Sequence, residues 1–91
     1  MDLNAKLTIE ERRRMLIFRS WHRGTREMDI LMGAFADAYV PNFDAAQLDE
    51  YERVLTCQDP DLYDWKCGRA EPPADEDCAV LRLFLAHKVA A

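Results

Sequence analysis

The side chains that could carry out chemistry in this 91-residue chain are few and far apart. Ser20 is the only serine, His22 and His87 lie near opposite ends, and no glycine-rich segment is typical of a phosphate-binding loop. An enzyme would need a nucleophile beside a base, an acid–base pair, a metal site or a cofactor cradle. None of these is indicated, so we expect no catalytic residues and no enzymatic activity.

Three cysteines, Cys57, Cys67 and Cys78, lack the close C-x-x-C spacing of zinc and redox motifs and cannot all pair within one chain. We expect reduced thiols that pack as small hydrophobic groups, and no bound metal. A zinc site built from the three cysteines and either His22 or His87 is the alternative.

The most distinctive segment is Arg23-Gly24-Thr25-Arg26-Glu27-Met28-Asp29. In a purely structural interpretation, Gly24 ends one helix, Thr25 caps the next, and Glu27 lies in its first turn. In a functional interpretation, Gly24 lets a partner's backbone approach, Arg23 donates to a carboxylate or carbonyl, and Glu27 accepts from an amide or a basic side chain. The two interpretations are compatible.

A second segment, Asp59-Pro60-Asp61-Leu62-Tyr63-Asp64-Trp65, has the same ambiguity. Asp59 and Pro60 suit a helix N-cap and first helical position, and Trp65 suits a core aromatic residue. If Trp65 or Tyr63 is exposed, it could instead anchor an interface, where aromatic residues are favoured.

The pattern R-G-x-x-E at Arg23, Gly24 and Glu27, with Asp29 following, resembles the signature of SdhE-type flavinylation factors. The segment from Asp59 to Trp65 is similar to the second characteristic segment of that family, and the resemblance covers about residues 9 to 88. His22 stands where many members carry an arginine.

The resemblance implies an assembly factor that holds the flavoprotein subunit of succinate dehydrogenase while FAD becomes covalently attached to a histidine of that subunit. Fumarate reductase is a further candidate partner. The chain itself would hold no stably bound cofactor and would act on the FAD of its partner. The implied partner-binding residues are Arg23, Gly24, Glu27, Asp29, Asp59 and Trp65.

Two other classes of function remain open at this point. One is a flavin transferase with its own FAD site, which the missing phosphate cradle disfavours. The other is an acidic helical adaptor, such as an antitoxin-like inhibitor, in which the motif residues are only helix caps.

Charge and hydropathy narrow the choice of partner. The net charge of −5 argues against general nucleic-acid binding, which requires clustered basic residues. Six arginines nevertheless crowd residues 12–26, while residues 44–77 are strongly acidic, so the basic helix either steers docking or is a solvated face. No stretch approaches the roughly 20 apolar residues of a membrane span. We expect a protein partner, no membrane insertion and the bacterial cytoplasm.

Five helices must position these residues. Thr8 and Glu11 form a capping-box pattern that predicts a helix over residues 8–22, with Gly24 after its end. Apolar residues at steps of three and four from Met28 to Tyr39 predict a second helix, which Pro41 closes.

A third helix is predicted over residues 45–57, after the cap-like Asp44. A short helix should start at Asp59-Pro60 and end before Gly68. A last helix should have the acidic residues 75–77 at its positive end and bury Val80, Leu81, Phe84 and Leu85. No stretch alternates like a strand, so we predict an all-α, compact five-helix bundle forming a single domain over residues 1–91.

Overall fold

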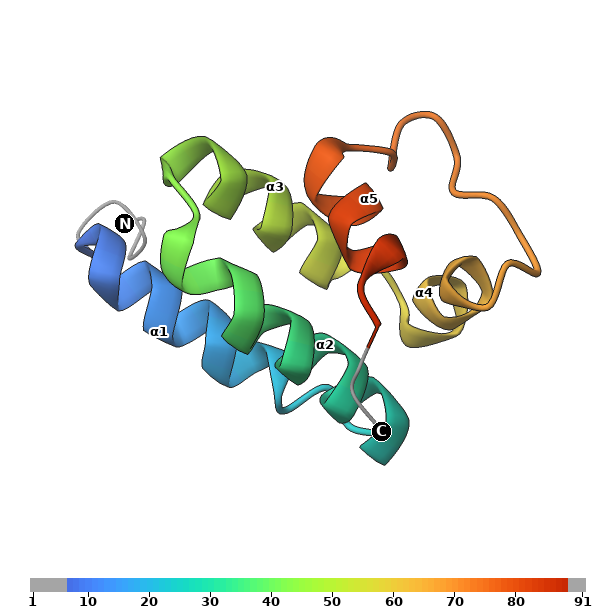
Figure 1. Cartoon of the computed structure of the whole chain (residues 1–91), viewed down its shortest axis with the longest axis horizontal. Coiled ribbons are helices and arrows are strands. Elements are labelled where there is room, and N and C mark those ends of the chain that lie inside the picture. Colours follow the sequence, from blue (N-terminus) through green and yellow to red (C-terminus); the bar gives the residue numbers. More distant parts are fainter. Residues whose placement is uncertain (1–6, 89–91) are drawn as a thin grey trace.

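A computed structural model describes residues 7–88, and this part of the chain is built from α-helices with no strand (Figure 1). The helices are α1 (Ile9–Ser20), α2 (Arg26–Tyr39), α3 (Ala45–Thr56), α4 (Asp59–Lys66) and α5 (Ala79–Ala86). A 3₁₀ helix, η2 (Val40–Asn42), follows α2 directly. The predicted all-α fold with five α-helices is confirmed.

Local hydrogen bonds explain where the first helices begin. At α1, the Glu11 amide donates to the Thr8 hydroxyl and the Thr8 amide donates to the Glu11 carboxylate, both at 3.1 Å. Asp44 and Gln47 exchange the same pair of bonds at the start of α3. Both capping boxes satisfy backbone amides that have no partner within the helix, so these helix starts can be predicted from local sequence.

The start of α4 differs from the prediction by one residue. Gln58 is the N-cap, and Asp59 already belongs to the first turn. The Asp59 carboxylate does not cap the helix because it pairs with Arg23, which lies in the connection between α1 and α2. A tertiary ion pair has therefore replaced the local capping role that the sequence suggested.

The acidic residues predicted for the positive end of the last helix lie directly before α5. Cys78 is its N-cap, so the acidic residues 75–77 precede the helix. Asp77 forms a paired hydrogen bond with Arg82, both contacts being 2.8 Å. The carboxylate that accepts from the Val80 amide, at 3.1 Å, comes from Glu50 on α3. A carboxylate from another element thus adds favourable negative charge at this helix end.

The helices enclose one core. In Figure 1, α1 and α2 form an antiparallel hairpin, and α3 packs against α1 and α5. The short α4 packs beside α5. The Phe35 ring lies at the centre, within 5.6 Å of the ring centroids of Tyr39, Tyr51 and Phe84. All five helices contribute buried side chains to this core, including Leu16, Met32, Phe35, Leu48, Tyr51, Leu62, Leu81 and Phe84.

One buried polar pair joins α1 to α3. The Ser20 hydroxyl donates to the Leu16 carbonyl at 2.7 Å, so the Tyr51 hydroxyl, 2.6 Å away, must donate to Ser20. Burial raises the pKa of Tyr51 to about 12, which keeps the phenol protonated at neutral pH. This pair attaches the C-terminal end of α1 to α3, just before the segment that contains Arg23 and Gly24.

Candidate functional site

The corner between α1 and α2 brings the distinctive motif to the surface. Gly24 has φ of +116°, and a Cβ added there would meet no atom within 4 Å. The backbone conformation, not a lack of space, therefore requires glycine at this position. Thr25 caps α2, accepting from the Met28 amide at 3.3 Å, which places Glu27 in the first turn. These features confirm the structural interpretation of Thr25 and Glu27.

Asp29 holds the corner from inside α2. Its carboxylate oxygen accepts from the Arg23 amide at 2.6 Å and from the Gly24 amide at 3.2 Å. These amides belong to the connection between the helices, where the backbone has no helical partner to donate to. The side chain of Asp29 thus determines the path of the backbone beside Glu27.

Arg23 reaches across to the junction of α3 and α4. Its Nε donates to Asp59 at 2.9 Å, Nη1 donates to the Leu55 carbonyl at 2.6 Å, and Nη2 donates to the Cys57 carbonyl at 2.8 Å. The two charged side chains are only 13% and 21% exposed. The Arg23 fork, which the sequence suggested could face a partner, is directed into the molecule and ties three helices together.

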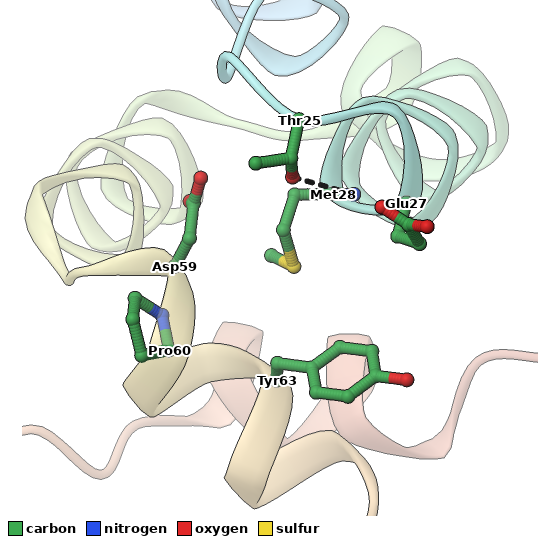
Figure 2. A pocket seen from close by; sticks show the side chains of 6 residues that line it. All are labelled: Thr25, Glu27, Met28, Asp59, Pro60 and Tyr63. Atoms are coloured by element: carbon green, nitrogen blue, oxygen red, sulfur yellow. Dashed lines mark hydrogen bonds between the residues drawn. The ribbon is translucent and has the colours of Figure 1, made fainter.

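A surface pocket of about 550 Å³ opens between the start of α2 and α4 (Figure 2). Its lining residues are Thr25, Glu27, Met28, Asp59, Pro60 and Tyr63. Figure 2 shows the Met28 thioether directed between Pro60 and the Tyr63 ring, while the carboxylates of Glu27 and Asp59 lie on opposite sides. The pocket therefore has an apolar floor and an acidic rim.

The two carboxylates at the rim of the pocket differ in whether they have a hydrogen-bond partner in the part of the chain that the structure describes. Asp59 is paired with Arg23, whereas Glu27 is exposed and makes no hydrogen bond or ion pair within residues 7–88. A carboxylate can accept up to about four hydrogen bonds. Glu27 is thus the rim acceptor that remains available to an incoming donor.

Of the predicted site residues, the structure groups five around this corner and places Trp65 elsewhere. Arg23, Asp29 and Asp59 form the supporting hydrogen bonds, while Gly24 and Glu27 are exposed. Trp65 is partly buried against the core and lines a smaller hollow of about 250 Å³ with Cys57, Glu76 and others.

Sequence reasoning did not identify Met28 and Pro60 as pocket residues. Met28 was assigned to the buried face of α2, and it is only 3% exposed, but its thioether forms the pocket floor. Pro60 was interpreted only as a helix-start residue. The one available signal was the pair Pro60 and Tyr63, which are three residues apart on one face of α4, opposite the buried Leu62.

The three thiols lie apart from this pocket. All three cysteines are free. Cys57 and Cys78 are partly buried and pack against the core as the predicted small hydrophobic groups, whereas Cys67 is exposed. Burial and the neighbouring Glu76 raise the pKa of Cys57 to about 11. Within the described part of the chain, no three His, Cys, Asp or Glu side chains group as a metal site would require.

Comparison with known proteins finds relatives that match most of this chain. A family model described as flavinator of succinate dehydrogenase matches residues 14–88. An FAD assembly factor SdhE from Acetobacter pasteurianus is 41% identical over 78 residues, which are 86% of this chain and 72% of that protein. The mitochondrial succinate dehydrogenase assembly factor 2 of Dictyostelium discoideum is 35% identical over 87% of this chain and 56% of its own length.

These matches define the class as a family of succinate dehydrogenase assembly factors. The chain belongs to the family of succinate dehydrogenase flavinators, as its resemblance to SdhE-type factors predicted. It spans little more than half of the Dictyostelium relative. No helix within residues 7–88 has the length and apolar character needed to cross a membrane.

Proposed function

We propose that the chain binds the flavoprotein subunit of succinate dehydrogenase and promotes the covalent attachment of FAD to it. The family match supports this proposal because the matched residues 14–88 include the corner, Arg23 with its hydrogen-bond partners, and all residues that line the pocket. The names of the relatives, an FAD assembly factor and a succinate dehydrogenase assembly factor, point in the same direction.

The observation that carries the proposal is the free Glu27 carboxylate at the rim of a preformed apolar pocket. Arg23, Asp29 and Asp59 hold the elements on both sides of that pocket by short hydrogen bonds. Rigid presentation of an acceptor reduces the entropy lost on binding. The corner is therefore suited to docking a partner segment without rearrangement.

The predicted site residues then divide into two roles. Gly24 and Glu27 contact the partner, Gly24 because it leaves open space and Glu27 because it can accept a hydrogen bond. Arg23, Asp29 and Asp59 position them. Trp65, on the far side of α4, supports the helix by packing.

In this mechanism the chain acts by binding and not by catalysis. The flavin supplies its own chemistry, and the reacting histidine belongs to the partner. A binding factor favours a flavinylation-ready conformation only if it binds that conformation more tightly than the alternatives. We place this activity in the bacterial cytoplasm.

The test is a titration of the purified chain with flavoprotein subunit that lacks covalent FAD. We expect a one-to-one complex that the Glu27→Ala change weakens. The fumarate reductase flavoprotein, titrated in parallel, tests the second candidate partner. Absence of binding to either flavoprotein would contradict the proposed function, and tight binding of FAD by the chain alone would favour a flavin transferase instead.

A further inference from the structure

The arginines near the start of the chain fall into two groups. Arg12 forms ion pairs with Asp49 and Glu52 on α3, at 2.9 and 3.0 Å. Arg13 donates to the Phe43 carbonyl at 2.7 and 3.1 Å. These two side chains, like Arg23, hold elements of the fold together, so their positive charges are paired within the protein.

Arg14, Arg19 and Arg26 form the second group. All three are exposed, and none makes a hydrogen bond or ion pair with any residue that the structure describes, while the charge of Arg14 helps to lower the pKa of Glu11 one turn before it. Arg14 and Arg19 lie on α1 and Arg26 begins α2, so these three exposed arginines all lie on one hairpin of a protein whose net charge is −5.

An exposed aromatic pair lies among these arginines. Phe18 is 63% exposed, the largest exposed fraction of any large hydrophobic side chain in residues 7–88. Its ring stacks on His22 with centroids 4.0 Å apart, and His22 Nδ1 lies 2.7 Å from the Phe18 carbonyl. The pair is thus held in one orientation although no core residue covers it.

Helical geometry places Arg14 and Phe18 on one surface, and ring stacking brings His22 beside Phe18. Arg14 and Phe18 are four residues apart on α1, and His22 follows the end of that helix. Arg19 is exposed and lies about 100° around the helix from Phe18, at the border of this surface. The buried Leu16 and Ser20 lie on the opposite side of α1, facing α2 and α3. We call Arg14, Phe18, Arg19 and His22 the α1 outer face. It leads along the chain directly to Arg23 and Gly24 at the corner.

The charge of the α1 outer face restricts what can cover it. A symmetric dimer through this face would bring like arginines together, because the same patch meets itself across a two-fold axis. Two free arginines on a protein of net charge −5 are too few for nucleic acid. An acidic surface that also offers an apolar contact to Phe18 matches both the charge and the ring.

We propose that the α1 outer face is a second contact for the flavoprotein subunit, binding an acidic patch with an exposed apolar side chain on that subunit. The inference rests on the proposed function and extends it beyond the pocket. Phe18 provides the desolvated anchor, and the two arginines steer the approach. Together with the corner, this face would make one continuous interface.

The experiment measures association and dissociation rates of the complex at low and high salt. Phe18→Ala should raise the Kd about tenfold, mainly through faster dissociation. Arg14→Glu should slow association about tenfold at low salt, and the difference should shrink to about twofold at 0.5 M salt. Arg19→Glu should behave like Arg14→Glu.

Matched controls separate this face from general effects of charge and apolar area. Ile9→Ala removes an exposed apolar side chain from the other end of α1, and Lys88→Glu makes the same charge change at an exposed position outside the helix. Both should bind like the wild type. Folding of every variant is checked by helicity and denaturation midpoint.

Each outcome bears on a separate statement. If the wild type binds and the Phe18 and arginine variants bind equally well, the α1 outer face is not a contact and the proposed function stands. If Phe18→Ala abolishes concentration-dependent self-association of the chain but leaves binding of the flavoprotein unchanged, the face binds a second copy and this inference is overturned. A wild-type chain that does not bind the flavoprotein removes the proposed function itself.

Discussion

Arg23 shows how a residue in a recognition motif can act through the fold. Its guanidinium donates to one carboxylate and two backbone carbonyls from a different part of the chain. A bare motif does not reveal whether an arginine faces outward or inward, because the partner is 32 or more residues away in the sequence. The charge-assisted bonds themselves explain why only arginine, with its planar fork, suits this position.

Replacing Arg23 by alanine should lower the free energy of unfolding by about 3 kcal/mol, because it leaves a half-buried carboxylate and two carbonyls without their donor. Arg69→Ala is the matched control, since Arg69 pairs with Asp64 at the exposed surface and should contribute less than about 1 kcal/mol. Denaturant titration measures both. Equal losses in the two variants would show that the Arg23 bonds do not stabilise the corner.

Cys57 gives a prediction that depends on pH. Its thiol donates to Glu76 at 3.2 Å, and burial together with that carboxylate raises its pKa from the ordinary 9.0 to about 11. The associated stability is therefore complete below about pH 9 and is lost as the pH rises through 11. Glu76→Gln removes the negative charge and should accelerate alkylation of Cys57 at pH 8.5, read out by peptide mass spectrometry. Alkylation at an unchanged rate would mean that Glu76 does not control the thiol.

At the scale of elements, the α1–α2 hairpin depends on a close approach at Gly33. This glycine is buried in the middle of α2, and a methyl group there would overlap the indole ring of Trp21. The Trp21 Nε1 donates to Asp37 at 3.3 Å, one turn further along α2. The indole thus lies flat across the helix because Gly33 has no side chain.

Gly33→Ala should destabilise the protein by about 1 to 3 kcal/mol, the usual range for overpacking. In a Trp21→Ala background the same change should instead stabilise it by up to about 1 kcal/mol, because alanine is the better helix former. Denaturation of the four proteins in this cycle gives the coupling directly. If Gly33→Ala has the same effect in both backgrounds, the indole does not pack on Gly33.

The helices were predictable because their signals are local. Thr8, Asp44 and Thr25 cap their helices through bonds to residues three positions along. The predicted helix over 8–22 and the observed Ile9–Ser20 differ only at the ends. Two features were not predicted. The short η2 follows Tyr39, where Pro41 indicated only a helix end, and Asp59 pairs with the distant Arg23 instead of capping.

At the scale of the whole molecule, a partly buried supporting frame lies beneath an exposed surface. The frame is the network of Arg23, Asp29 and Asp59, whose partners no periodicity or cap pattern could indicate. The surface is the corner at Gly24 and Glu27 with its pocket, for which the motif had indicated the two exposed residues but not the apolar floor. Partner contact at these residues stays a prediction.

The most direct measurement is covalent flavin fluorescence on the denatured flavoprotein subunit, in cells that lack their native factor and are complemented with each variant. Glu27→Ala should leave the fold nearly unchanged, since a first-turn carboxylate contributes only about 0.3 to 1 kcal/mol. It should reduce covalent flavin about tenfold, the effect of losing one charge-assisted hydrogen bond. Glu71→Ala, which removes an exposed carboxylate outside the pocket that pairs only loosely with Arg82, should restore the wild-type level. A stable, well-expressed Glu27→Ala protein that also restores the wild-type level would contradict the account.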